Sequence, residues 1–182
     1  MNNFTFTHKL RNKIRVDSTT NIILGNNLKI VHCNIYVKGN NNTISIDDNS
    51  ILRNTKLEIV GNNCSIKIGK DCMIGDNCYL SAKENNTHLS IGDDCGLSRN
   101  VKVMTSDGHP IFQNNIRIND AKNVEIQNHI WIADNVTILK GVTICNGSVV
   151  GINSTVTRTI PAQCIAVGNP AIVVKQNIYW KS

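Results

Sequence analysis

The residue best suited to proton transfer in this sequence is His109, which lies between Gly108 and Pro110 in the segment 105–112. Histidine has an ordinary pKa of about 6.5, so it can take a proton from a substrate near neutral pH. Glycine and proline favour a turn, which would hold the imidazole in place. Asp107 stands two residues earlier, where it can orient the ring, bind a substrate, or remain an exposed turn carboxylate. The sequence leaves these interpretations of Asp107 open.

The elements that must position His109 are marked by a repeat of six residues. Aliphatic residues recur at every sixth position, and a second, mostly small or β-branched residue follows four places after each. The first set is Ile126, Ile132, Ile138, Ile144, Val150 and Val156, with Ala162 continuing the phase; the second set is Ile130, Val136, Val142, Ser148, Ser154 and Ile160. Neither an α-helix nor an amphipathic strand has this period.

A chain that turns a corner every six residues does have this period, and three such sides close a triangular coil of eighteen. Segments 68–72, 74–78 and 91–95 are three earlier copies, each beginning Ile-Gly and ending in Cys. The Gly, Asn and Asp residues that follow the aliphatic position suit a corner backbone. The repeat therefore predicts an all-β solenoid, a parallel β-helix whose coils bury one another.

A slower repeat overlies the first. Gly39, Gly61 and Glu84 are each followed by Asn-Asn at spacings of 22 and 23, which is one coil plus a small bulge. The rhythm also breaks between Val103 and Ile126, so about seventeen residues leave the coil, and long insertions in compact repeats are commonly functional. We predict an N-terminal cap (1–20), six or seven coils (21–170) with a protruding loop at about 104–123, and a short C-terminal tail (171–182).

The bulk composition limits the function classes. The 182 residues fit one domain, and the seven cysteines form no C-x-x-C pair, so they are interpreted as buried thiols in a reducing compartment. With no predicted signal peptide and no integral membrane segment, a cytoplasmic protein is expected. The net charge of +6 favours anionic partners. The basic run 8–15 lacks interleaved aromatics, so no nucleic-acid binding is predicted.

The chain resembles the hexapeptide-repeat acyltransferases over nearly its whole length. Segment 105–112, the run from Ile-Trp-Ile-Ala at 130–133 through 138–144 and 149–156, and Gly-Asn-Pro-Ala at 168–171 carry the likeness. Within the family it looks most like O-acetyltransferases of sugars, including sialic acids and capsular or lipopolysaccharide glycans. The resemblance implies a left-handed β-helix, a homotrimer, and acetyl-CoA as co-substrate held between neighbouring protomers.

The resemblance also implies roles for individual residues. His109 is the general base, and Trp131 lies close to the reacting acetyl group or forms a wall between protomers. Arg117 grips an anionic or polyhydroxyl acceptor or makes a surface ion pair. No serine or cysteine beside His109 has a nucleophile context, so direct transfer is expected. The residues implied at acetyl-CoA are Ala133, Asp134, Gly151 and Ile152 along the pantetheine arm and Thr157, Arg158 and Lys175 at the phosphate end.

Three other functions stay open. N-acetylation of an amino sugar needs the same base. A metal enzyme of the carbonic anhydrase type would use His88, His109 and His129, which are about one coil apart, but their phases in the repeat disagree and no metal is expected. A non-catalytic scaffold solenoid is the third. The acceptor is predicted to be a sugar or polysaccharide, and the +6 charge makes it an acidic one as a hypothesis.

Overall fold

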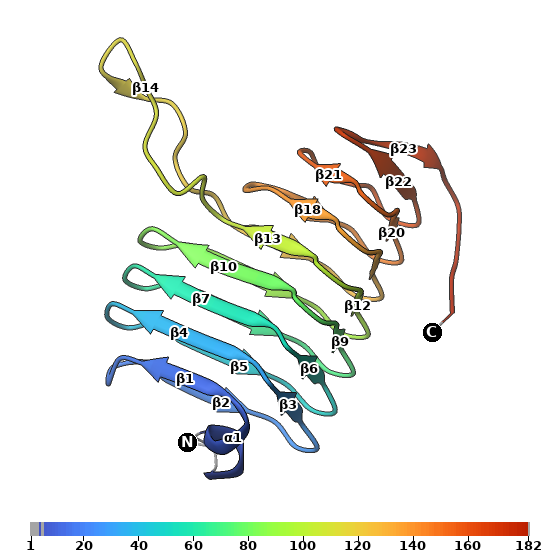
Figure 1. The fold of residues 1–182 in the computed structure, drawn as a ribbon. Coiled ribbons are helices and arrows are strands. Elements are labelled where there is room, and N and C mark those ends of the chain that lie inside the picture. Colours follow the sequence, from blue (N-terminus) through green and yellow to red (C-terminus); the bar gives the residue numbers. More distant parts are fainter. Residues whose placement is uncertain (1–3, 5, 182) are drawn as a thin grey trace.

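The computed structural model describes residue 4 and residues 6–181, which form a solenoid of stacked triangular coils (Figure 1). A six-residue helix, α1 (Phe6–Arg11), lies at the N-terminal end of the stack. Across the described residues, no helix is both long and apolar enough to cross a bilayer. The fold is the predicted left-handed parallel β-helix.

Three sheets form the sides of the prism and are named here by their first strands. The β1 sheet runs β1 (Lys13–Val16), β4 (Asn34–Lys38), β7 (Lys56–Val60), β10 (Tyr79–Lys83), β13 (Lys102–Met104), β18 (Thr137–Ile138), β21 (Thr155–Val156). The β2 sheet runs β2 (Asn21–Leu24), β5 (Thr43–Ile46), β8 (Ser65–Ile68), β11 (His88–Ile91), β16 (Val124–Ile126), β19 (Thr143–Ile144). The β3 sheet runs β3 (Lys29–Val31), β6 (Ile51–Arg53), β9 (Met73–Ile74), β12 (Gly96–Leu97), β17 (Trp131–Ile132), β20 (Val149–Val150), β22 (Ile165–Gly168), β23 (Ala171–Lys175).

The aliphatic residues of the repeat stack in columns inside the prism. In the β3 sheet, Leu52, Ile74, Leu97, Ile132 and Val150 are successive register partners, and each is at most 1% exposed. Burying such a side chain is worth about 1.5–3 kcal/mol. The six-residue rhythm therefore produces one continuous apolar core that runs the length of the stack.

Asparagines stabilise the corners between the sides. Asn100 donates from Nδ2 to Oδ1 of Asn135, which donates in turn to Asn153, each over 2.9 Å. All three have φ between 58° and 60°. Asparagine tolerates this left-handed conformation better than most residues. The side-chain ladder repeats the backbone stacking of the coils, which explains why the sequence is rich in asparagine.

The coils before the loop are wider than those after it. Asn34 pairs with Lys56, 22 residues on, whereas Thr137 pairs with Thr155, 18 residues on. The extra residues form the predicted bulge, where Gly39 has φ of 114°. A Cβ on Gly39 would come within 2.0 Å of the Gly61 carbonyl oxygen of the next coil, so only glycine fits.

Two cysteine predictions and one packing prediction can be compared with the structure. Cys64, Cys72, Cys78 and Cys95 occupy the second inward position and are at most 2% exposed, as predicted, and no disulfide joins the seven cysteines. The prediction that Ala162 continues the inward phase is wrong, because it is exposed. The last coil is two residues shorter, so that Val150 pairs with Ala166, which is fully buried.

The ends of the stack differ from the predicted boundaries. Strand β1 pairs in parallel with β4, so residues 13–16 of the expected N-terminal cap belong to the first coil. At the other end, β23 turns back and pairs antiparallel with β22. The segment after β23 runs along the outside of the stack (Figure 1). The expected tail therefore begins with a strand that covers the last coil.

Candidate active site

The chain leaves the solenoid after β13 and returns at β16, which produces the protruding loop in Figure 1. Strands β14 (Phe112–Gln113) and β15 (Ile116–Arg117) pair antiparallel within it. Coil partners on either side of the loop, such as Asp93 and Asn128, are 35 residues apart, whereas Asn128 and Asn146 are 18 apart. The loop thus adds 17 residues at the place where the repeat breaks.

The base of the loop is pinned to the coil beneath it. The Thr105 side chain is fully buried, and its Oγ1 accepts a 2.9 Å hydrogen bond from the Lys83 backbone N–H. The Thr105 carbonyl accepts a 2.9 Å bond from the Lys122 N–H, which closes the two ends of the loop on each other. The loop therefore departs from a fixed point at the corner that follows β10 and β13.

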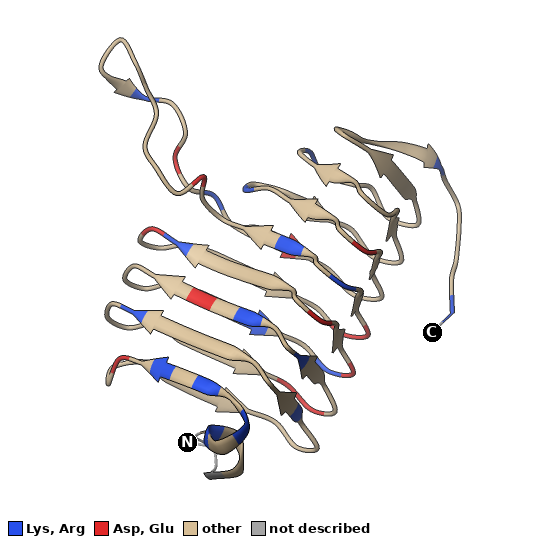
Figure 2. Cartoon of the chain, viewed as in Figure 1, with Lys and Arg blue, Asp and Glu red and all other residues tan. Residues whose placement is uncertain are grey.

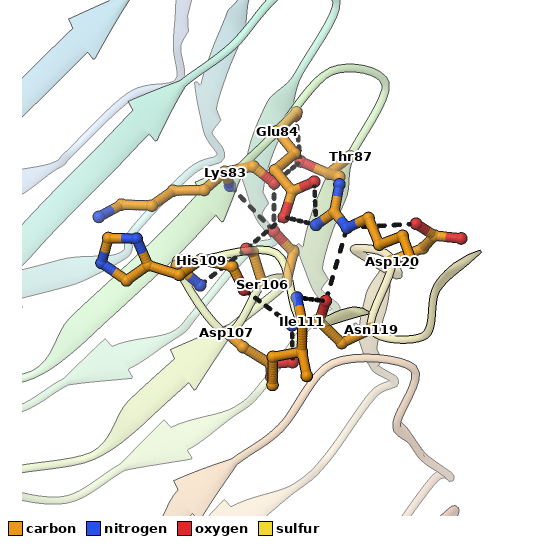
Figure 3. Close-up of polar contacts among 12 residues, drawn as sticks. Lys83, Glu84, Thr87, Ser106, Asp107, His109, Ile111, Asn119 and Asp120 are labelled. Atoms are coloured by element: carbon orange, nitrogen blue, oxygen red, sulfur yellow. Dashed lines mark hydrogen bonds and ion pairs between the residues drawn. The ribbon is translucent and has the colours of Figure 1, made fainter. Parts of the chain in front are cut away.

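Glu84 is the first of two polar centres that hold the loop (Figure 3). Its Oε1 accepts hydrogen bonds from Ser106 Oγ at 2.6 Å and Arg117 Nη2 at 2.8 Å. Arg117 Nη2 also lies 2.7 Å from Oε2, and its Nε is 3.4 Å from Asp120 Oδ1. Burial opposes ionisation of Glu84, but the bonds from Ser106 and Arg117 outweigh it and keep its pKa below the ordinary value. Arg117 is thus an anchor for the loop within this chain.

Asn119 is the second centre and is only 8% exposed. Its Nδ2 donates to Asp107 Oδ2 at 2.9 Å and to the His109 carbonyl at 2.8 Å, while its Oδ1 accepts from the Ile111 N–H at 2.7 Å. Lys140 Nζ donates to Asp107 Oδ2 at 2.5 Å and to the Asn119 carbonyl at 2.7 Å. The Lys140 bond, assisted by Asn119, lowers the pKa of Asp107. One side chain therefore holds the backbone at His109 and Ile111 together with the Asp107 carboxylate.

The His109 side chain points away from these anchors. Its backbone is held by Asn119, but no hydrogen bond to its ring occurs among the described residues, and the residue is exposed. Figure 3 shows the imidazole extending to the same side as the Lys83 amine, while Asp107 lies on the other side. An open hollow of ≈ 600 Å³ is lined in part by Lys83, Ser106 and Gly108, the residue before His109. A held backbone and an accessible ring leave the imidazole able to reach a substrate proton, which general base catalysis needs.

Trp131 lies on a different side of the prism. It belongs to β17 in the β3 sheet, whereas the loop leaves from the β1 sheet. The side chain is 44% exposed, and its Nε1 is 3.4 Å from Ser98 Oγ. Trp180 of the C-terminal segment packs beside it, with ring centroids 6.2 Å apart. A single chain therefore does not bring Trp131 and His109 together.

The residues implied at acetyl-CoA fall into separate groups. One group follows β17 and β20 at one corner and comprises Ala133, Asp134, Gly151 and Ile152. The N–H groups of Ala133 and Gly151 donate hydrogen bonds of 2.9 Å to the carbonyls of Val150 and Ala166 in the next coil. Ile152 is 59% exposed. Asp134 is held by Arg99, whose Nη2 lies 2.6 Å from Oδ2.

The phosphate-end group lies elsewhere. Thr157 and Arg158 are exposed and follow β21, at the same corner as the loop and Lys140, while Lys175 is exposed at the end of β23. Within one chain, the loop edge therefore carries His109, Thr157 and Arg158. The corner after β17 carries the residues implied at the pantetheine arm. The two surfaces would have to come from neighbouring chains to meet.

The other two histidines of the metal hypothesis are engaged at separate places. His88 Nδ1 is 2.9 Å from Ser65 Oγ on the β2 sheet. His129 Nδ1 is 2.6 Å from Asp94 Oδ2, and its ring stacks on Trp180 with centroids 4.2 Å apart. In the part of the chain that the structure describes, no group of three His, Cys, Asp or Glu residues could hold a metal ion.

Sequence reasoning missed the residues that position His109. Glu84, Asn119 and Lys140 have contacts with partners 10 to 33 residues away, which no local pattern reveals. One signal was present for Glu84, because it replaces the glycine that precedes Asn-Asn at positions 39 and 61. Glu84 has a φ of 72°, which is uncommon for a residue other than glycine. A glutamate at such a position suggests that its side chain has a specific role.

The fold and the loop together define a left-handed β-helix with a histidine-bearing insertion, the architecture of an acyltransferase class. The solved polySia-specific acetyltransferase NeuO superposes with a TM-score of 0.76 and 31% sequence identity, covering 94% of this chain and 88% of that chain. This chain belongs to the hexapeptide-repeat acyltransferase family. No family model matches the sequence.

Two curated relatives carry the name polysialic acid O-acetyltransferase. The one from Escherichia coli O1:K1 / APEC is 35% identical over 125 residues, or 68% of this chain and 33% of the relative. The one from Neisseria meningitidis is 38% identical over 129 residues, or 69% of this chain and 58% of the relative. The chain matches between one third and somewhat over half of these relatives' lengths.

Proposed function

We propose that this chain is an acetyl-CoA-dependent O-acetyltransferase that acts on a hydroxyl group of a sugar in a bacterial surface glycan. The observation that carries the proposal is His109, an exposed imidazole on a loop whose backbone is fixed by Asn119. The likeness to enzymes named polysialic acid O-acetyltransferase supports a carboxylated glycan as the acceptor. Sialic acid polymers, capsule and lipopolysaccharide are the acceptor classes to test.

In the proposed reaction His109 accepts the proton of the acceptor hydroxyl while its oxygen attacks the thioester carbonyl carbon. The new C–O bond forms, the C–S bond breaks, and the CoA sulfur leaves with the proton that His109 returns. General base catalysis of this kind contributes about 10²–10⁴ in rate. The proposed transfer is direct and forms no acyl-enzyme, and the Ser106 hydroxyl, which donates to Glu84, holds the loop. Holding both substrates in place supplies further acceleration.

The arrangement of the remaining residues supports a site shared between protomers. Thr157 and Arg158 lie on the loop edge with His109, and Trp131 lies on another side. We propose a homotrimer in which the corner near Ala133 and Gly151 of one protomer faces the loop edge of the next, with acetyl-CoA between them. Arg158 and Lys175 would then pair with its phosphates. Seven free cysteines suit the reducing cytoplasm, the proposed location.

The test of this function is the identity of the product. The purified chain is incubated with acetyl-CoA and, in parallel, with polysialic acid, an amino sugar and a neutral sugar, and the acetylated product is treated with alkali. We expect acetyl groups on the carboxylated polymer that are released by mild alkali, as esters are. Alkali-stable acetyl on the amino sugar would instead establish N-acetylation. Absence of transfer to every acceptor would contradict the proposal.

A further inference from the structure

The outer face of the β1 sheet differs from the other two sides in charge. Its strands carry six cations and one acid, whereas the β2-sheet strands carry Lys67 and Glu125 and the β3-sheet strands carry Lys29, Arg53 and Lys175. Figure 2 shows the basic positions distributed over β1, β4, β7, β10 and β13. The charged residues of the β1 sheet are Lys13, Arg15, Lys38, Lys56, Glu58, Lys83 and Lys102. The strands of this side therefore carry a net charge of +5 (six cations and one acid), against 0 for the β2 sheet and +3 for the β3 sheet.

Strand register places these residues in rows that run along the stack. One row is Lys13, Asn34, Lys56, Tyr79 and Lys102, in successive strands. Neighbouring strands are about 4.8 Å apart, so the row from β1 to β13 spans about 19 Å. Because side chains alternate across a strand, every member of a row points outward.

The basic surface ends at the loop. Beyond Lys102 the same row continues as Thr137 and Thr155, which carry no charge. A second row places Arg15 beside Tyr36, whose ring is half-buried. The positive charge on this sheet is thus confined to the strands from β1 to β13, and its last strand leads directly into the loop that bears His109.

Glu58 organises the lysines in the middle of this surface. Its oxygens lie 2.8 Å from Lys56 Nζ and 2.8 Å from Lys83 Nζ, and Tyr79 donates its hydroxyl to the same carboxylate. Glu58 is only 9% exposed, whereas the Lys56 and Lys83 side chains are 42% and 34% exposed. One buried acid therefore fixes two amines at the surface, and Lys83 extends to the same side as the His109 ring (Figure 3).

We propose that this basic face of strands β1 to β13 binds a linear polymer of carboxylated sugars and leads it to His109. Lys13 and Lys102 at the two ends of one row, and Arg15 in the next row, can each pair with a different carboxylate of a polymer that carries one carboxylate per sugar, while Glu58 already pairs with Lys56 and Lys83 between them. Delivery to His109 rests on the proposed O-acetyltransferase function, while binding to the face does not.

The test removes the cations most distant from His109 and compares them with equal cations on another side. The variant is Lys13→Gln/Arg15→Gln on β1, and the matched control is Lys29→Gln/Arg53→Gln on β3 and β6, which removes the same charge from early coils. With long polysialic acid at low salt, we expect the first variant to raise KM about fivefold to tenfold with kcat unchanged. With oligomers too short to reach β1, KM should be the same for the β1 variant and the original chain. The control variant should have the KM of the original chain with every acceptor.

A second measurement separates this proposal from the proposed function. Binding of fluorescently labelled polysialic acid is followed by polarisation without acetyl-CoA. Weaker binding in the β1 variant alone supports the face even if no acetyl transfer occurs. Equal weakening in both variants, or in neither, overturns the face even if transfer proceeds. Binding of single-stranded DNA as tight as that of polysialic acid would show a general polyanion surface and would also overturn it.

Discussion

The wide coils before the loop (residues 34–104) and the compact coils after it (residues 124–160) solve the same packing problem with different outer faces. In the β1 sheet, β4, β7 and β10 have five residues each, whereas β18 and β21 have two. The interior is equally dry in both, since Ile59 and Ile138 are fully buried. In register Ile138 corresponds to Leu57, so Ile59 belongs to the extra residues. These form an additional buried column with Val37 and Ala82 and also lengthen the exterior.

That difference separates two tasks along one stack. The longer strands expose Lys56 and Lys83 on either side of Glu58, while the short strands expose only Thr137 and Thr155 in the equivalent row. The loop with His109 emerges where one coil type gives way to the other. Under the proposed function, the wide coils bind the acceptor and the compact coils bind acetyl-CoA, with transfer at their boundary.

The largest expected effect tests whether the cores of the wide and the compact coils are packed equally tightly. Ile59→Ala in the wide coils and Ile138→Ala in the compact coils should each lower the free energy of unfolding by about 2–5 kcal/mol, because each leaves a cavity in a dry column. Chemical denaturation at a fixed protein concentration measures both. If Ile59→Ala lowers the free energy of unfolding by less than half as much as Ile138→Ala does, the wide coils are more loosely packed than the compact coils. That result would contradict the expected equal packing.

The next effect concerns the boundary itself. Asn119→Ala removes the hydrogen bonds to the His109 carbonyl, the Ile111 N–H and the Asp107 carboxylate and should lower kcat about a hundredfold, since small misplacements of a catalytic group are this costly. KM for acetyl-CoA and the unfolding midpoint should change little. Gln113→Ala, on the exposed hairpin of the same loop, is the matched control. Equal rates for the two variants would show that Asn119 does not position His109.

The smallest of these effects is the pH dependence of stability that Glu58 gives to the wide coils. Burial opposes ionisation of Glu58, but hydrogen bonds from Lys56, Lys83 and Tyr79 outweigh it and lower its pKa to about 2 from 4.5. A depressed pKa stabilises the folded state above the ordinary pKa, and this contribution is lost as pH falls from 4.5 toward 2. Lowering the pKa from 4.5 to about 2 corresponds to about 3.4 kcal/mol, and solvent screening at the partly exposed lysines reduces the expected contribution to about 2 kcal/mol. Unfolding free energies of the original chain should thus fall more steeply with acid than those of Glu58→Gln, and parallel curves would contradict this assignment.

Much of the fold could be predicted because its constraint is local and repeated. Ile132 and Val150 are six-residue-phase positions that the triangular coil buries, and the cysteines at the second inward place are buried with them. The prediction failed at Ala162, where a coil two residues shorter shifts the phase. It also missed that β1 belongs to the first coil, because Ile14 and Val16 are only partly covered there and the six-residue rhythm is weak.

The candidate site was predictable only in part. His109 could be found from its position in the break of the repeat, and the polar centres that hold it could not. Glu84 meets Arg117 from 33 residues away, and Lys140 meets Asp107 across the same interval. Such contacts depend on how the coils stack in three dimensions. They also change the interpretation of Asp107 and Arg117, which are engaged with loop and coil partners within the chain.

The most direct test of the central claim compares two histidine variants of equal chemistry. His109→Asn removes the proposed base, and His32→Asn changes a histidine in an early coil whose φ of 58° asparagine accepts. Rates of acetyl transfer from acetyl-CoA to the carboxylated polymer are measured for both, together with acetyl-CoA binding. We predict a loss of at least about a hundredfold for His109→Asn with binding retained, and an unchanged rate for His32→Asn. A His109→Asn variant that still transfers acetyl at the original rate would contradict the account.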